Sequence, residues 1–228
     1  MEISRDSAGE ITPDIGSHKS GGMEKGCVSG MKIVLYTQRV EVIEDYGERR
    51  DCADQNIPRF IEACGYLPVP LPNIKSIAEK MVEQIQPEGI ILTGGNSLVK
   101  YGGDAPERDE TEKRILDISL QNDIPIYGFC RGMQVILDYF DCEIEQVQGH
   151  VAVRHKVSGT LGALEVNSFH NQACYKVKGS LEVLARTQDG VIEAVRHKNK
   201  RILGTMWHPE REEHFQILDI RRIKELFD

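Results

Sequence analysis

The segment Gly128-Phe-Cys130-Arg-Gly132 constrains the fold most, because it places a cysteine between two glycines where an apolar run changes to a helical pattern. A sharp turn from strand to helix crowds the backbone, and glycines on both sides of the central residue relieve the crowding. The central side chain then projects above the edge of the sheet, where the dipole of the following helix favours a thiolate. The segment predicts a nucleophile elbow, with a buried structural cysteine beside two incidental glycines as the alternative.

The first half of the chain alternates between two patterns. Continuous apolar runs typical of buried strands are followed by segments whose apolar residues recur at helical spacing. The strands are predicted at 32–37, 67–71 and 89–93, and the helices at 57–64, 77–85 and 109–121. Such alternation predicts an α/β fold of three layers, with a mostly parallel central sheet and helices on both faces. Ligands are then expected at the carboxyl ends of the strands.

The two ends of the chain differ from this pattern. After residue 142, short β-type segments at 163–166, 181–186, 191–195 and 202–206 predict a mixed or antiparallel extension of the sheet, closed by a helix near 217–227. Residues 1–30 are rich in Ser, Gly and charged residues and show no apolar periodicity. We therefore expect a flexible extension at 1–30 and a single domain at 31–228.

Composition excludes several classes of function. A net charge of −8 argues against a nucleic-acid-binding protein, whose surface would be basic. No apolar run approaches the roughly 20 residues of a membrane span. The six cysteines are scattered without the spacing of zinc ligands, so neither a zinc site nor a disulfide framework is expected. The cytoplasm is the expected compartment.

A second candidate site is Trp207-His-Pro-Glu210, which directly follows an apolar run at 202–206. His208 and Glu210 are two residues apart in extended chain, so both side chains can project to one side and the carboxylate can orient the imidazole. Alone, the motif also fits a strand-end histidine and a solvated carboxylate. Together with Cys130 it gives the order of a Cys-His-Glu catalytic triad.

A third candidate is Leu92-Thr-Gly-Gly-Asn96, with two glycines at the end of a predicted strand. Exposed backbone N–H groups in such a loop can point at a ligand oxygen. The amides of Gly95 and of Arg131, the residue after the cysteine, are therefore candidates for an oxyanion hole. The alternative is that the two glycines only make a turn.

These three segments, in this order, resemble the class I glutamine amidotransferase family, which has a flavodoxin-like three-layer α/β fold. The resemblance covers residues 31–228. Within that family, residues 62–72 and 166–172 are similar to the stand-alone γ-glutamyl hydrolases, which release glutamate from small γ-glutamyl amides. The similarity also implies γ-glutamyl-CDP-amidate, used in bacterial capsule synthesis, as substrate, although no single residue identifies it.

The resemblance implies a role for each matching residue. Cys130 would attack the γ-carbonyl and form a thioester, His208 would transfer protons, and Glu210 would hold His208. The groups expected to bind the glutamyl part are the side chain of Gln134 and the backbone around Ser168, Phe169 and His170. The reaction needs neither a metal nor an organic cofactor.

Two other functions remain open at this point. The same residues would serve in a glutaminase subunit that supplies ammonia to a partner synthetase, although the two γ-glutamyl-hydrolase-like segments argue against it. A non-catalytic binding protein on the same scaffold is the other alternative, because fold alone does not imply activity. The complete set of Cys130, His208 and Glu210 argues against this second alternative.

Overall fold

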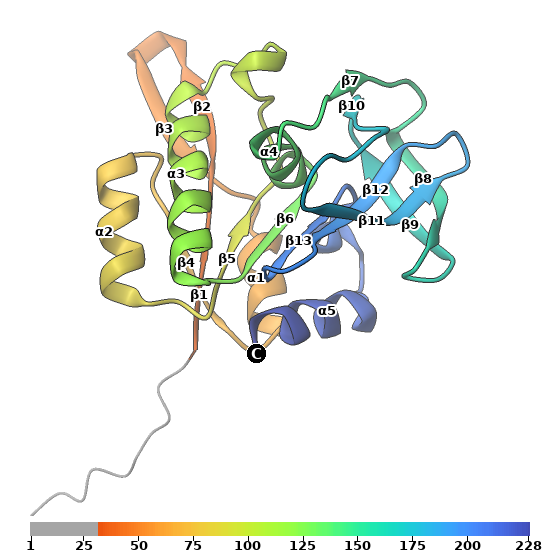
Figure 1. Cartoon of the computed structure of the whole chain (residues 1–228). Coiled ribbons are helices and arrows are strands. Elements are labelled where there is room, and N and C mark those ends of the chain that lie inside the picture. The colour runs from red at the N-terminus through yellow and green to blue at the C-terminus, as the bar shows by residue number, and fades with distance from the viewer. Residues whose placement is uncertain (1–31) are drawn as a thin grey trace, which may run out of the picture. The chain divides into compact units, whose positions relative to one another are not determined.

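The computed structural model describes residues 32–228, which belong to one compact unit; the predicted extension at 1–30 lies outside the described residues. A nine-stranded sheet in the order β4-β1-β5-β6-β13-β12-β11-β8-β9 forms its centre (Figure 1). Its parallel half contains β4 (Leu67–Pro70), β1 (Ile33–Tyr36), β5 (Gly89–Leu92), β6 (Ile126–Phe129) and β13 (Ile202–Thr205). Its antiparallel half contains β12 (Ile192–His197), β11 (Leu181–Thr187), β8 (Val151–Gly159) and β9 (Leu164–Phe169). The predicted α/β fold and its antiparallel extension are confirmed.

Helices cover both faces of the parallel half, as Figure 1 shows. One face carries α2 (Lys75–Ile85), α3 (Pro106–Asn122) and α4 (Arg131–Tyr139), and the other carries α1 (Asn56–Ala63) and α5 (Ile217–Phe227). Successive residues of a strand point to opposite faces. Accordingly, Leu35 of β1 packs into the core beneath α2, α3 and α4, and its neighbour Val34 packs beneath α1 and α5. Burial on both faces explains why these strands are continuous apolar runs.

Several elements had no sequence signal. The hairpin of β2 (Arg39–Ile43) and β3 (Glu48–Cys52) is mostly exposed, so no apolar run marks it. Strand β8 was missed for the same reason, since most of its side chains are exposed or half-buried. The remaining short elements are β7 (Glu145–Gln146), β10 (Gln172–Ala173), η1 (Glu44–Tyr46), η2 (Val99–Tyr101) and η3 (Pro209–Arg211).

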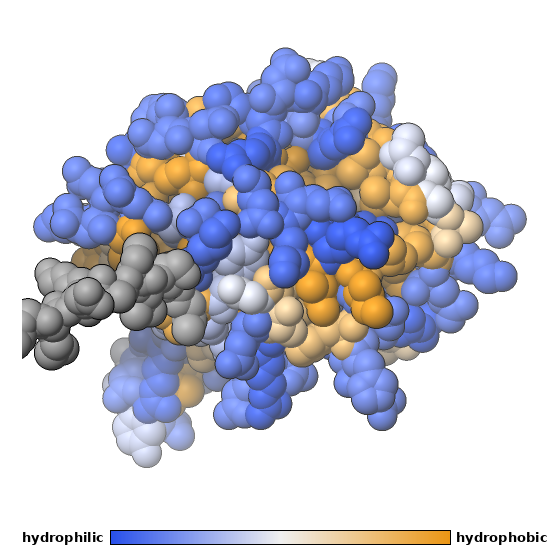
Figure 2. Space-filling model, turned by 90° about the horizontal axis from the view of Figure 1, so that it is seen from below, coloured by the Kyte–Doolittle hydropathy of each residue, from blue (hydrophilic) through white to orange (hydrophobic). Residues whose placement is uncertain are grey.

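The surface seen from below is mixed in character. Figure 2 shows hydrophilic side chains over much of this face, with hydrophobic residues between them. Apolar surface of this kind is normal when it is broken up by charged groups. Among residues 32–228, none of the helices combines the length and the apolar character needed to cross a membrane.

Candidate active site

Cys130 lies at a strained turn between β6 and α4. Its backbone has φ 51° and ψ −110°, a conformation that residues with a side chain rarely adopt and that costs about 1–3 kcal/mol. The flanking glycines allow the turn: a Cβ at Gly128 would lie 2.6 Å from the carbonyl of Gly132, and a Cβ at Gly132 would collide with the carbonyl of Leu92. Strain retained at one position by close backbone packing is typical of a functional residue, and this geometry is that of a nucleophile elbow.

The imidazole of His208 is held beside this cysteine. His208 follows β13, and its Nδ1 lies 2.7 Å from Oε1 of Glu210 on η3. Both side chains are almost completely buried. Its Nε2 is also buried and makes no hydrogen bond of standard geometry among the described residues. This nitrogen is therefore a candidate to exchange a proton with Cys130.

Burial lowers the pKa of His208, but the neighbouring Cys130 and the carboxylate of Glu210 raise it to about 9. A value above 6.5 means that the folded protein favours the imidazolium form.

Two further contacts fix the position of His208. Asn167 on β9 donates from Nδ2 to the backbone carbonyl of His208 at 2.8 Å and accepts from its backbone N–H at 2.9 Å. The ring itself lies between Phe129 and Phe169, with centroid separations of 5.6 and 5.7 Å. Sequence reasoning did not select Asn167, although it belongs to the 166–172 segment. It ties the antiparallel half of the sheet to the candidate catalytic histidine.

A buried ionic network lies beneath the elbow and the glycine loop. Glu112 on α3 accepts from Arg108 Nε at 3.0 Å and also pairs with Arg131, and Arg131 pairs in addition with Asp109. Arg108 and Glu112 are fully buried, and Arg131 is 1% exposed. Burial raises the pKa of Glu112, but the two guanidinium groups outweigh it and lower the pKa below its usual value. Glu112 is therefore an ionised carboxylate shared by two buried cations.

This network orients the glycine loop. Arg108 donates to the carbonyl oxygens of Thr93, Gly94 and Gly95 at 2.8, 3.1 and 2.6 Å. In a trans peptide the C=O of one residue and the N–H of the next point in opposite directions. The N–H of Gly95 therefore points away from Arg108. The N–H of Arg131, at the first position of α4, has no acceptor within its own helix, so the amides of Gly95 and Arg131 remain candidates for the predicted oxyanion hole.

A small pocket joins most of the predicted site residues. Its volume is about 140 Å³, and its lining includes Gly95, Cys130, Arg131, Gln134, Phe169, His170 and His208. Gln134 donates from Nε2 to the carbonyl of Gln172 at 3.1 Å, which orients its amide. Ser168 lies beneath the pocket wall, where its hydroxyl donates to the carbonyl of His150 at 2.7 Å. Glu210 lies behind His208.

The family follows from comparison with known proteins. Residues 49–216, which are most of the chain, match the family described as "Glutamine amidotransferase class-I". The chain belongs to the class-I glutamine amidotransferase family. The chain is 34% identical over 194 residues to the gamma-glutamyl-CDP-amidate hydrolase of Campylobacter jejuni subsp. jejuni serotype O:2, and the match covers 84% of this chain and 95% of that protein.

Two further proteins are similar to this chain. The gamma-glutamyl-gamma-aminobutyrate hydrolase of Escherichia coli O157:H7 is 35% identical over 188 residues, which cover 64% of this chain and 73% of that protein. The crystal structure of a glutamine amidotransferase from Thermotoga maritima has a TM-score of 0.60 at 15% identity, covering 86% of this chain and 82% of that one. The latter likeness shows that the fold is shared.

Removing the shared negative charge of the buried network should destabilise the folded protein. In Glu112→Gln, the buried Arg108 and Arg131 lose their common counter-ion, so we expect the free energy of unfolding to fall by about 3 kcal/mol. Urea denaturation measures it. The matched control is Glu110→Gln on the same helix, where an exposed carboxylate pairs with Lys75 and the change should stay within about 0.5 kcal/mol. Equal effects of the two changes would contradict a positioning role for the network.

Proposed function

We propose that this chain is a hydrolase that cleaves γ-glutamyl amides through a thioester on Cys130. The observation that carries the proposal is the strained Cys130 at the edge of a small pocket, next to a buried His208 that hydrogen-bonds Glu210. The 34% identity with a γ-glutamyl-CDP-amidate hydrolase, over nearly the whole of that protein, supports the choice of γ-glutamyl compounds.

In the proposed reaction, the sulfur of Cys130 forms a bond to the γ-carbonyl carbon, and its proton resides on His208. The carbonyl oxygen becomes negative and is stabilised by the amides of Gly95 and Arg131. The C–N bond then breaks as His208 passes its proton to the departing nitrogen. In the second half, His208 takes a proton from water, the hydroxide adds to the thioester, and glutamate leaves as the C–S bond breaks. Glu210 holds the ring of His208 throughout.

The glutamyl group is proposed to fill the 140 Å³ pocket. Gln134 offers its amide oxygen to the α-ammonium group, because its Nε2 is held by Gln172. The backbone from Ser168 to His170 forms the facing wall and is proposed to hold the α-carboxylate. Binding these remote groups aligns the γ-carbonyl with Cys130, so their loss from the substrate should lower kcat as well as raise KM.

The leaving group must lie outside this pocket, because drug-sized ligands need about 300 Å³ or more. Two arginine side chains lie next to the pocket, where the leaving group would extend. The side chain of Arg39 packs over Gly95, and Arg211 stacks on the ring of Phe169 with its guanidinium carbon 4.5 Å from the centroid. Guanidinium groups bind phosphate well, and so we propose γ-glutamyl-CDP-amidate as the substrate and cytidine diphosphoramidate as the product. The proposed pathway is capsule synthesis.

The dependence of turnover on salt concentration should differ between this substrate and glutamine. Exposed charge contacts are screened over about 10 Å at 0.1 M ionic strength, so rising salt is expected to lower kcat/KM for γ-glutamyl-CDP-amidate much more than for glutamine. Arg211→Gln should remove most of that difference. Arg154→Gln is the control, since Arg154 is exposed and pairs with Glu212 instead of bordering the pocket. Identical salt responses of both substrates would argue against a phosphate-bearing leaving group.

A panel of γ-glutamyl amides tests the function as a whole. Glutamate release is measured for glutamine, γ-glutamyl-γ-aminobutyrate and γ-glutamyl-CDP-amidate with the isolated chain. The proposal expects turnover without any partner and a preference for the CDP-linked substrate. Release from glutamine that is negligible alone and rises when a synthetase is added would identify a glutaminase subunit instead.

A further inference from the structure

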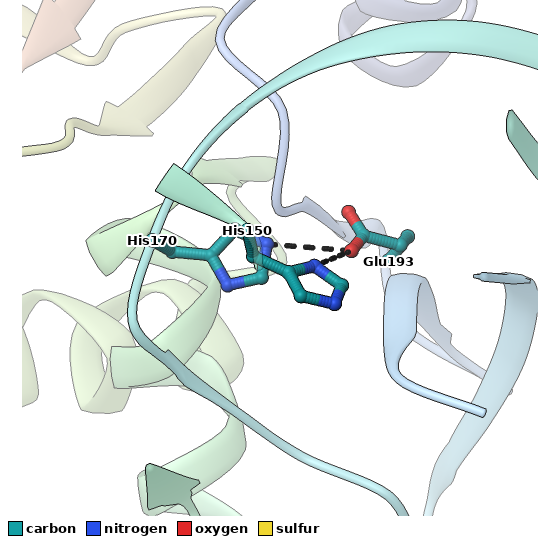
Figure 3. A group of neighbouring side chains, drawn as sticks. All are labelled: His150, His170 and Glu193. Carbon is teal, nitrogen blue, oxygen red and sulfur yellow. Dashed lines mark ion pairs between the residues drawn. The ribbon is translucent and has the colours of Figure 1, made fainter. Parts of the chain in front are cut away.

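A second group of buried ionisable side chains lies outside the proposed triad. His150 directly precedes β8, His170 directly follows β9, and Glu193 lies on β12 (Figure 3). The two histidines are 3% exposed and the glutamate 0%. Charged or polar side chains so deeply buried normally have satisfied hydrogen bonds. These three do not: Nδ1 of His150, both ring nitrogens of His170 and both oxygens of Glu193 lack a hydrogen-bond partner among the described residues.

The orientation of His150 sharpens this observation. Its Nε2 lies 2.9 Å from Oδ2 of Asp189. A carboxylate oxygen accepts hydrogen bonds, so this contact favours the tautomer of His150 that carries its proton on Nε2. With a proton on Nε2, the neutral ring would present the lone pair of Nδ1 toward the carboxylate of Glu193, and a cation bound between the two groups would satisfy both.

The distances fit a metal ion in that position. Oε1 of Glu193 lies 3.4 Å from Nδ1 of His150 and 3.3 Å from Nε2 of His170, and all three ligand atoms lie within 4.8 Å of one another. These separations are long for hydrogen bonds. Zinc bonds of about 2.0–2.2 Å in tetrahedral geometry place neighbouring ligand atoms about 3.3–3.5 Å apart. The two distances from Oε1 of Glu193 to the histidine nitrogens therefore match two edges of the tetrahedron that ligand atoms form around zinc.

We propose that His150, His170 and Glu193 bind one divalent transition-metal ion, of which zinc is the representative. Two imidazoles and one carboxylate form a ligand set suited to zinc, and the fourth position is left for water. The contact of His150 with Asp189 is the carboxylate–histidine arrangement that fixes a metal-binding ring in one tautomer. His155 also lies 3.4 Å from Oε1 of Glu193, but it falls outside the group of mutually close ligand atoms and packs against the ring of His150.

The ion would join three separate segments and support the wall of the catalytic pocket. His170 belongs both to this cluster and to the pocket lining, and its neighbour Phe169 packs against His208. The ion takes no part in the proposed hydrolysis, and the inference does not depend on that activity. The sequence did not predict it, because the three ligands come from distant positions without a metal-binding spacing.

Metal binding can be tested directly on the full chain. Protein stripped with a chelator is titrated with zinc, and bound metal and the melting temperature are measured. The same titration in Cys130→Ala excludes binding by the proposed catalytic thiol. We expect about one zinc per chain in both proteins and a rise in melting temperature, and at least about a tenfold loss of affinity in Glu193→Gln and His150→Asn. The control is Glu182→Gln on β11, whose half-buried carboxylate pairs with Arg196 away from the three proposed ligands.

Cobalt provides a readout that does not depend on how the variants fold. Cobalt bound by the unsubstituted chain should give the visible absorption of a four-coordinate site, and zinc should displace it. The proposal is overturned if the stripped protein shows no saturable binding near one equivalent, if binding disappears in Cys130→Ala alone, or if the folded ligand variants bind as tightly as the unsubstituted chain.

Discussion

Replacing Cys130 by alanine is expected to lower glutamate release by at least about a thousandfold. Alanine removes the sulfur that forms the thioester, and the remaining oxyanion amides and binding pocket supply only residual catalysis. The fold should persist, because the strained backbone is held by the glycines at 128 and 132 and by the hydrogen bond from Cys130 N–H to the carbonyl of Thr205 at 2.8 Å. Steady-state glutamate release measures the effect.

The control for this prediction is Cys52→Ser. Cys52 is another free thiol and lines the neighbouring cavity, outside the pocket that contains Cys130. Its change should leave kcat within about twofold, while substrate binding to Cys130→Ala, measured by calorimetry, should stay close to that of the unsubstituted chain. Substantial turnover by Cys130→Ala would remove this residue from the mechanism.

The second large effect is expected for His208→Asn, which should be nearly as damaging as loss of the cysteine, about a thousandfold in kcat. Asparagine cannot take the thiol proton or return one to the departing nitrogen. Glu210→Gln should be milder, about ten- to a hundredfold, because glutamine keeps an oxygen that can accept from Nδ1–H of His208. Stopped assays of glutamate release measure both. Small and equal effects of the two changes would place the His-Pro-Glu segment outside the site.

The elements that the sequence predicted are those whose own side chains are buried. Strand β5 is buried at every position, and α1 buries Ile57, Phe60 and Ile61 on one face, so both leave a clear periodic pattern. The β2–β3 hairpin and most of β8 expose their side chains, and an exposed strand leaves no such pattern. Local apolar periodicity therefore reports burial, and exposed strands depend on pairing that the local sequence does not encode.

In the candidate site, too, the sequence predicted some features and missed others. The turn at Cys130 and the pairing of His208 with Glu210 are local, so short motifs predict them. The support of these groups is not local. Arg131 was singled out for its amide, yet its side chain pairs with Glu112 on another helix, and Asn167 reaches His208 from the antiparallel half of the sheet. Contacts between distant segments follow from the folded topology alone, and the same holds for the three proposed metal ligands.

The central claim is that hydrolysis proceeds through a γ-glutamyl thioester on Cys130. Its most direct test is intact-protein mass measurement after rapid acid quenching of the enzyme with γ-glutamyl-CDP-amidate or glutamine, followed by peptide mapping. The proposal predicts a mass increase of one γ-glutamyl group, located on Cys130, that appears within the first turnover and is absent from Cys130→Ala. Glutamate release without any adduct, or an adduct on Cys52 instead, would contradict it.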